Sequence, residues 1–260
     1  MNKHSTKRTV IIHRHIFKNA GTTFDFILKN NFGEAFCDHR DDVPMRKEGE
    51  KYILRYLTEN PEIKALSSHH LWFNPESGKH FQFVPVVFLR HPIERLRSVY
   101  SFERQQHAGT PGALMAKKLD FRTYVAWLMQ DDVSAVIRNI HTRYLAGVKG
   151  PKPLSKKHLR AAKNSIVRNP LIGVVDLFDE SLKIFDMEFK KLGMVLDFSY
   201  KPQNVMQRTG ITDCETRARE VLEELGELAA IVLDKNSFDL QLYYFAKQLI
   251  QLRIQQIHQE

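Results

Sequence analysis

Cysteine is scarce in this chain, and long hydrophobic runs are missing from it. Two cysteines occur, Cys37 and Cys214, with no CxxC pair, which argues against a thiolate zinc site or a dithiol redox motif. One disulfide is compatible with this count, but two free thiols in a reducing cytosol is the simpler interpretation. The apolar stretch that follows the polar N-terminus, Val10–Ile12, is too short for the core of a signal peptide. No run reaches the roughly 18 apolar residues of a transmembrane helix, so we expect a soluble, cytoplasmic protein without a membrane span.

Acidic residues are outnumbered by basic ones. The 260 residues include 39 Lys and Arg against 30 Asp and Glu, which gives a formal net charge of +9. Such an excess favours an anionic partner, whether nucleic acid, a membrane surface, an acidic polysaccharide or a phosphorylated cofactor. A hydrophobic content of 43% with 27% charged residues is typical of a globular protein rather than a disordered one. We expect residues 1–260 to form a single domain.

Strands and helices alternate along the sequence. A β-branched run predicts a strand over 9–16, then a loop over 17–23 and a helix over 24–29. The run over 83–90 is apolar on both faces, which is typical of a central strand in a covered parallel sheet. Further strands are expected over 63–70 and 171–177, and a turn over 109–112. Helices are expected over 48–60, 93–106, 121–129, 133–144 and 240–257, and another begins at 179. A capping box of Thr212 and Glu215 predicts one more helix, which runs to 233. This alternation predicts an α/β fold with a mostly parallel central sheet flanked by helices.

The loop after the first strand has the composition of a phosphate-binding loop. Backbone N–H groups at a helix start are unpaired, and the helix dipole favours an anion there. Glycine allows close approach of the backbone, threonine hydroxyls donate hydrogen bonds, and lysine adds a positive charge. These residues are Lys18, Asn19, Ala20, Gly21, Thr22 and Thr23. The segment is not a Walker A loop, because its lysine precedes its only glycine. The alternative is an ordinary strand-to-helix turn with a threonine cap.

A second anion site is expected after the strand over 83–90. Ligands in open α/β sheets bind beyond the carboxyl ends of strands. Arg90 lies at such an end, and Ser98 lies about two turns into the next helix. A guanidinium binds phosphate bidentately, so Arg90 and Ser98 are candidates for a separate phosphate. Arg95 and Arg97 are interpreted as a solvent-exposed helix face.

The two segments together resemble those of sulfotransferases that use 3′-phosphoadenosine 5′-phosphosulfate (PAPS). Residues 15–23 are similar to the 5′-phosphosulfate loop of that family, and residues 88–98 to its 3′-phosphate motif, with the same spacing from Arg to Ser. Segments 139–147, 171–181 and 239–247 resemble others of its carbohydrate branch, which includes the heparan sulfate 2-O- and 6-O-sulfotransferases and soluble bacterial relatives. The resemblance extends from residue 9 to about residue 248. The chain differs from the usual family residues at Phe17, His91 and Asp176, which concerns the subfamily more than the reaction.

The resemblance implies a P-loop-like fold and a defined reaction. A sulfuryl group would pass in line from PAPS to an acceptor hydroxyl, expected on a saccharide, with no metal required. Lys18 would stabilise charge on the bridging oxygen, residues 18–23 would hold the 5′-phosphosulfate, and Arg90 and Ser98 the 3′-phosphate. Similarity of residues 70–73 to a GH-x-x-F stretch marks His70 as the general base. His69 is its orienting neighbour or the alternative base, and Glu94 and Glu103 are weaker candidates.

Other interpretations remain open at this level. Without the resemblance, His69 and His70 are better explained as a surface pair beside an aromatic lid. A kinase with a divergent P-loop and a non-catalytic polyanion-binding protein are the alternative functions, although no nucleic-acid-reading motif is present. His13, His15 and His39 lack a carboxylate or cysteine at fixed spacing, so no zinc site is expected.

Two segments have no settled role from the sequence. Asn139 and Arg143 are expected near the nucleotide or the acceptor. The basic block 149–168 is either an acceptor groove or lid, or a solvated helix with a buried stripe of Leu159, Ala162 and Ile166. The sequence identifies neither the acceptor nor the oligomeric state.

Overall fold

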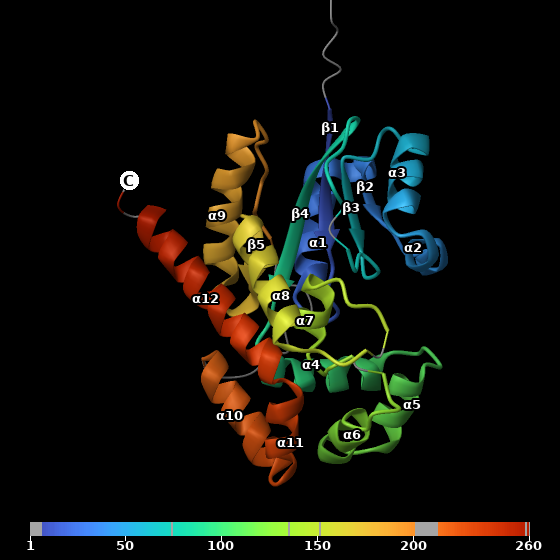
Figure 1. Ribbon diagram of the computed structural model, residues 1–260, viewed down its shortest axis with the longest axis vertical. Coiled ribbons are helices and arrows are strands. Elements are labelled where there is room, and N and C mark those ends of the chain that lie inside the picture. The colour runs from blue at the N-terminus through green and yellow to red at the C-terminus, as the bar shows by residue number, and fades with distance from the viewer. Residues whose placement is uncertain are drawn as a thin grey trace, which may run out of the picture.

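Five parallel strands form the centre of the molecule (Figure 1). The structure is a computed structural model. It describes residues 7–73, 75–134, 136–150, 152–200, 213–257 and 259. The sheet order is β2-β3-β1-β4-β5, and every neighbouring pair is parallel. The strands are β1 (Arg8–Arg14), β2 (Phe36–Asp38), β3 (Ala65–Ser68), β4 (Phe81–Leu89) and β5 (Ile172–Val174). The predicted α/β fold with a parallel central sheet is confirmed.

Twelve α-helices lie in the described part of the chain. They are α1 (Gly21–Phe32), α2 (Asp42–Glu48), α3 (Glu50–Glu59), α4 (Pro92–Gln105), α5 (Pro111–Lys118), α6 (Phe121–Leu128), α7 (Ile140–Leu145), α8 (Lys156–Arg168), α9 (Phe178–Lys191), α10 (Cys214–Leu225), α11 (Leu228–Lys235) and α12 (Ser237–Ile257). None of them combines the length and the apolar character that crossing a lipid bilayer requires.

Helices cover both faces of the sheet. On one face, Ile11 of β1 and Phe88 of β4 pack against α1 and α9. On the other, Val10 and Ile12 pack against α2 and α3, and Val87 packs against α8 and α12. Burial on both faces explains why β1 and β4 are apolar at successive positions.

A further group of helices lies beyond the carboxyl ends of the strands. Helices α4, α5, α6, α10 and α11 share a hydrophobic cluster of their own, and Figure 1 shows them gathered at that end of the sheet. Helix α4 begins at Pro92, capped by the ring of His91, whose nitrogen accepts a hydrogen bond from the Glu94 N–H. The end of the sheet that favours ligand binding is therefore the end at which this helical layer begins.

Several predicted boundaries were wrong. Helix α1 begins three residues earlier than predicted, because Ala20 adopts a left-handed conformation and ends the loop there. The helix predicted over 133–144 is observed only over 140–145, since Asn139 is left-handed at φ 48°. The predicted helix to 233 is divided by Gly226 at φ 57°, and Asp213 caps its first half. Thr212 lies outside the described residues.

Three short elements were not predicted from the sequence. Helix α2 and strand β2 each span few residues, and α5 begins inside the segment predicted as a turn. By contrast, the stripe predicted in the basic block is confirmed, because Leu159, Ala162 and Ile166 are the buried residues of α8. The exposed side of α8 carries most of the lysines of that block.

Two helix starts cap each other. The Asn139 side-chain oxygen accepts hydrogen bonds from the N–H groups of Phe238 and Asp239, at 3.0 and 2.9 Å. The Asp239 carboxylate accepts from the N–H groups of His141 and Thr142, at 2.9 and 2.8 Å. These hydrogen bonds join segments 139–147 and 239–247, and the Asn139 side chain is committed to helix capping.

Candidate active site

The predicted site residues follow three neighbouring strands. Strand β1 lies between β3 and β4, so the loops that leave their carboxyl ends meet at one edge of the sheet. Lys18 follows β1, His69 and His70 follow β3, and Arg90 follows β4. The strand order thus brings together residues that are 72 positions apart in the chain.

The loop after β1 is tightly wound. Lys18 and Ala20 have φ values of 62° and 57°, in the left-handed region that non-glycine residues rarely occupy. Such backbone strain is characteristic of functional loops. Ala20 caps α1 without a side-chain hydrogen bond, so the alternative of a threonine cap is wrong. The N–H groups of Thr23 and Phe24 donate to the Ala20 carbonyl, at 3.0 and 3.3 Å, so the N–H groups of Gly21 and Thr22 are the candidates for binding an anion at this helix start.

The Asn19 side chain holds this loop in place. Its amide nitrogen donates to the Phe88 carbonyl of β4 at 2.8 Å and lies 2.9 Å from the ring nitrogen of His141. Asn19 is buried. Its side chain therefore fixes the loop, and its backbone N–H donates to the Ile16 carbonyl at 3.2 Å.

Lys18 points toward α4. Its Nζ lies 4.5 Å from the centre of the Phe102 ring, a cation–π contact. Burial lowers the pKa of Lys18, and the charges of Arg90 and Arg95 lower it further. Three cations therefore converge on this loop, which favours a bound polyanion.

Arg90 is oriented by Glu94. Its Nε and Nη2 donate to the two oxygens of the Glu94 carboxylate, at 2.6 and 2.9 Å, and its Nη1 donates to the Lys18 carbonyl at 3.3 Å. Arg217 of α10 donates to the same carboxylate at 3.1 Å. Burial alone would raise the pKa of Glu94, but its hydrogen bonds and charge interactions with the two arginines outweigh this and hold the pKa below its usual value. Glu94 is thus a partner of Arg90, and Ser98 lies one helical turn beyond it.

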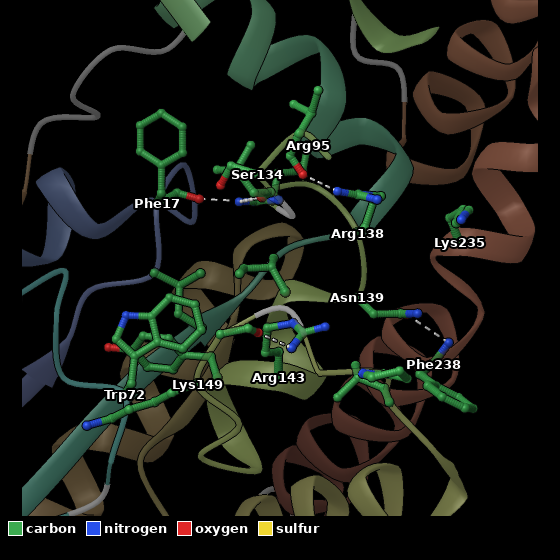
Figure 2. Close-up of a pocket in the computed structure, with 18 of the residues that line it drawn as sticks. Phe17, Trp72, Arg95, Ser134, Arg138, Asn139, Arg143, Lys149, Lys235 and Phe238 are labelled. Atoms are coloured by element: carbon green, nitrogen blue, oxygen red, sulfur yellow. Dashed lines mark hydrogen bonds between the residues drawn. The ribbon is translucent and has the colours of Figure 1, made fainter. Parts of the chain in front are cut away.

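Arg95 is buried, so the expectation of a solvent-exposed face was wrong. Only 1% of its surface is exposed. Its Nε donates to the Phe17 carbonyl at 2.9 Å, as Figure 2 shows, and its Nη2 to the Val136 carbonyl at 2.9 Å. Arg97 stacks on Phe121 and pairs with Glu224. Two arginines, Arg90 and Arg95, therefore bind consecutive carbonyls of the loop after β1.

His69 and His70 lie in the turn after β3. The Nδ1 of His69 donates to the His15 carbonyl at 2.8 Å, which leaves Nε2 as its unprotonated nitrogen when the ring is neutral. Burial, followed by the charge of His15, lowers the pKa of His69 to about 4. The backbone N–H of His70 is hydrogen-bonded to the Ser68 hydroxyl. Both rings line a large cleft.

The cleft has a volume of about 1360 Å³. It extends from Phe17 and the two histidines to α7 and the start of α12, and its lining includes Trp72, Arg143 and Lys149 (Figure 2). Glu103 also lines it, and burial raises the pKa of that carboxyl. Lys18, Arg90 and Ser98 are not among the lining residues. Residues 18–23 and the cleft are thus separate parts of the structure, and His69, which lines the cleft, is hydrogen-bonded to the His15 carbonyl at the end of β1.

Comparison with known proteins identifies the family of this chain. The profile of the sulfotransferase family matches residues 5–246. An uncharacterized protein of Archaeoglobus fulgidus is 32% identical over 184 residues, which is 67% of this chain and 71% of that relative.

The chain belongs to the sulfotransferase family.

This sulfotransferase contains a buried triad that the sequence did not predict. His13 and His15 place their Nδ1 atoms 2.6 and 2.9 Å from the two oxygens of Asp25. Asp25 thus supplies the carboxylate whose absence argued against a metal site, and the three side chains offer ligand atoms within 4.8 Å of one another. The two distances are those of hydrogen bonds to separate oxygens, so we describe the triad as hydrogen-bonded. His39 lies apart from it and bonds to Tyr52.

Arg217 and Asp25 were not identified from the sequence. Arg217 lies 123 positions from Glu94, and no local pattern connects them. Asp25 carried a weak signal, because two histidines on one face of a buried strand need a polar partner.

Both cysteines are free thiols, as predicted.

Proposed function

We propose that this sulfotransferase transfers a sulfuryl group from PAPS to a carbohydrate hydroxyl. The observation that carries the proposal is the bond from Arg90 to the Lys18 carbonyl, which joins two anion sites at one sheet edge. A donor with a phosphosulfate at one end and a phosphate on its ribose requires two such sites. The N-terminus of α1 would bind the 5′-phosphosulfate through residues 18–23, and Arg90 and Ser98 the 3′-phosphate.

The transfer breaks one bond and forms another. The acceptor oxygen attacks sulfur as the bond from sulfur to the bridging phosphate oxygen breaks, and adenosine 3′,5′-bisphosphate leaves. Negative charge grows on that bridging oxygen. Lys18, at the start of the loop, would supply the compensating positive charge. No step in this scheme requires a metal ion.

His70 would accept the proton of the acceptor hydroxyl. An imidazole is suited to this role near neutral pH, and His70 lines the cleft next to His69. The pKa of His69 is about 4, so His69 is neutral at pH 7. It therefore does not oppose a positive charge on His70. Glu94 is excluded as the base by its two arginine partners, and Glu103 is a weaker candidate.

The cleft suits a saccharide. Trp72 packs against Tyr144, with ring centres 5.0 Å apart, and lines the wall of the cleft beside Arg143. The face of an aromatic ring packs against the apolar face of a sugar, and cations bind its acidic substituents. Lys149 lies 5.9 Å from the centre of the Phe73 ring and extends the basic lining.

An assay with PAPS and a panel of saccharides tests the proposal. Transfer should add about 80 Da, the mass of SO₃, to one acceptor. The bisphosphate product should raise the melting temperature of the protein, because a ligand that binds only the folded state stabilises it. Failure of both PAPS and the bisphosphate to stabilise the protein would contradict the proposal. Stronger stabilisation by ATP and magnesium would favour a kinase instead.

A further inference from the structure

Asp25 of helix α1, His13, His15 and His69 form a hydrogen-bonded column that leads from α1 to the turn after β3. Asp25 lies one turn after Gly21 in α1 and contacts both His13 and His15 of the β1 end. The three side chains are nearly buried, with 1%, 8% and 12% of the side chains of His13, His15 and Asp25 exposed. A buried carboxylate is costly unless it is fully hydrogen-bonded, and here each oxygen has an imidazole partner.

The charge of Asp25 fixes the protonation of its partners. Burial alone would raise the pKa of Asp25, but its hydrogen bonds and charge interactions with His13 and His15 hold the pKa far below the usual range. An ionised carboxylate only accepts hydrogen bonds. Each imidazole must therefore present a proton on Nδ1 to Asp25, which leaves Nε2 as the nitrogen that faces away.

The ring of His15 occupies the space beside the anion loop. A side chain at Gly21 would place its Cβ 2.1 Å from the Cδ2 and Nε2 atoms of His15. Glycine at the first residue of α1 therefore allows this ring to pack against the loop backbone. The position and tautomer of His15 bear directly on the segment that would hold the phosphosulfate.

His15 also contacts His69, in the turn after β3. Its carbonyl accepts from Nδ1 of His69 at 2.8 Å, and the two ring centres lie 4.0 Å apart. One residue thus touches both the loop after β1 and the turn after β3. His13 stacks on His15 with ring centres 5.1 Å apart, and no contact of His13 with Gly21 or His69 is found in the described structure.

We propose that His15, held by Asp25, is a positioning residue that sets the phosphosulfate loop and His69 in their working geometry. The role rests on the proposed sulfuryl transfer, but the hydrogen-bonded column itself exists without a ligand. Replacing Asp25 with Asn leaves one amide oxygen as acceptor and places an N–H donor against the other imidazole. One histidine must then move its proton to Nε2, and a proton on Nε2 of His15 would face the start of α1.

Imidazole ¹⁵N NMR of the ligand-free protein tests the column directly. We expect both His13 and His15 of the wild type to carry their proton on Nδ1. In Asp25→Asn, the ring resonances of His13 and His15 should show that one of the two has moved its proton to Nε2. Because His15 loses its ionised partner, the backbone signals of residues 18–23 and the ring signals of His69 should also shift. Asp25→Glu, which keeps the charge, should restore much of the wild-type pattern. A wild-type His15 protonated only on Nε2 would overturn the proposal, even if no variant folds.

The matched control is His13→Gln, which removes the other hydrogen bond to the same carboxylate. Both His13→Gln and Asp25→Asn should lower the melting temperature. Only Asp25→Asn should weaken binding of the bisphosphate, about tenfold for one lost charge-assisted hydrogen bond. Equal effects of the two variants on stability, with unchanged binding and unchanged loop and His69 signals, would show that the triad only supports folding. A wild type that binds no bisphosphate would count against the proposed function, while the tautomer experiment would still decide the role of Asp25.

Discussion

The Nη1 atom of Arg90 donates to the backbone carbonyl of Lys18, 3.3 Å away. Arg95 does the same to the carbonyl of Phe17, at 2.9 Å. Two arginines from the start of α4 thus hold two consecutive carbonyls of the loop after β1. The segments of the two proposed anion sites are separate in the sequence but hydrogen-bonded to each other in the structure, so a change in either one should affect the other.

Lys18→Ala should lower kcat by about 10²- to 10³-fold, the range for loss of one group that stabilises charge in the transition state. The melting temperature should change little, because the side chain is only partly buried. Lys29→Ala, at the exposed end of α1, is the control and should leave kcat unchanged. Steady-state kinetics with saturating acceptor measures both. A kcat within twofold of wild type for Lys18→Ala would remove Lys18 from the mechanism.

Glu94→Gln should weaken binding of the bisphosphate about tenfold, because Arg90 loses the charge that orients its guanidinium. Isothermal titration calorimetry measures the dissociation constant. Glu224→Gln is a matched control, since Glu224 pairs with another arginine of α4, Arg97. Unchanged affinity in Glu94→Gln would mean that Arg90 does not depend on this carboxylate.

The free energy of unfolding should fall as the pH falls from about 6.5 toward 4. The pKa of His69 is about 4 in the folded protein, against an ordinary value of 6.5, chiefly because of burial. Burial also lowers the pKa values of His13, His91 and His141. The unfolded chain therefore binds more protons than the folded one across this interval, and acid favours unfolding. Urea titrations at several pH values give the free energy of unfolding as a function of pH. That free energy should fall less steeply with falling pH in His69→Gln than in the wild type. An identical pH dependence would contradict the assignment.

Asn139→Ala and Asp239→Ala should each destabilise the fold by about 1–2 kcal/mol, the upper part of the range for helix caps. Because each side chain caps the helix that carries the other, the double variant should lose less than the sum of the single losses. Asp120→Ala removes an ordinary cap, on Thr123, and its loss should add independently to that of Asp239→Ala. Additive losses for Asn139 and Asp239 would show that the two caps act separately.

Trp72→Ala should raise the acceptor KM severalfold and leave bisphosphate affinity unchanged, because the indole lines the cleft rather than the anion loop. Kinetics at fixed PAPS and varied acceptor measures the first effect, and calorimetry the second. A change in bisphosphate affinity with no change in acceptor KM would place Trp72 on the donor side.

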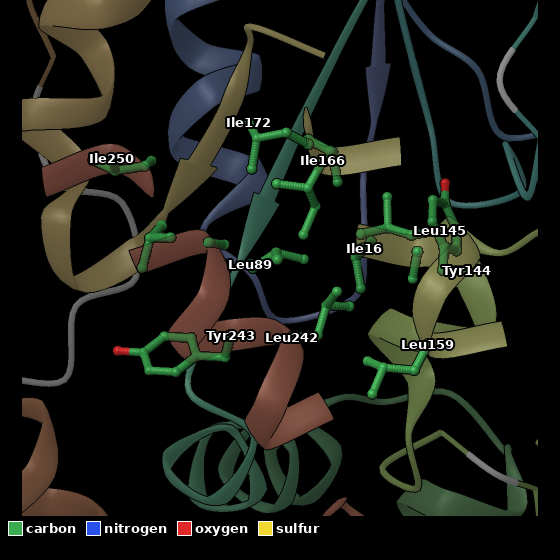
Figure 3. Packing of buried hydrophobic residues seen from close by; sticks show 14 of the residues in the cluster. Ile16, Leu89, Tyr144, Leu145, Leu159, Ile166, Ile172, Leu242, Tyr243 and Ile250 are labelled. Carbon is green, nitrogen blue, oxygen red and sulfur yellow. The ribbon is translucent and has the colours of Figure 1, made fainter. Parts of the chain in front are cut away.

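Much of the scaffold could be predicted because its signals are local. The apolar runs of β1 and β4 indicate strands buried on both faces, and the helical spacing in α8 predicts its buried stripe. Figure 3 shows Leu159 and Ile166 from this stripe in one cluster with Ile172 of β5 and Leu242 of α12. The positions of Lys18 and Arg90 at strand ends also follow from the sequence, since strand ends define one edge of a parallel sheet.

The remaining features depend on contacts between distant segments. Arg95 looks like a surface residue in the helical pattern, yet backbone carbonyls from two other loops satisfy its guanidinium in the interior. The helix predicted over 133–144 begins only at Ile140, because Asn139 is left-handed and its side chain caps α12, about 100 positions later in the chain. The partnership of Asp25 with two histidines requires the packing of α1 on β1. None of these can be deduced from spacing alone.

A crystal structure with adenosine 3′,5′-bisphosphate tests the central claim most directly. The account predicts the 5′-phosphate at the N-terminus of α1, on the backbone of residues 18–23 beside Lys18, and the 3′-phosphate on Arg90 and Ser98. His70 should then face the 5′-phosphate across the mouth of the cleft. A bisphosphate bound elsewhere, or a 3′-phosphate that contacts neither Arg90 nor Ser98, would contradict it.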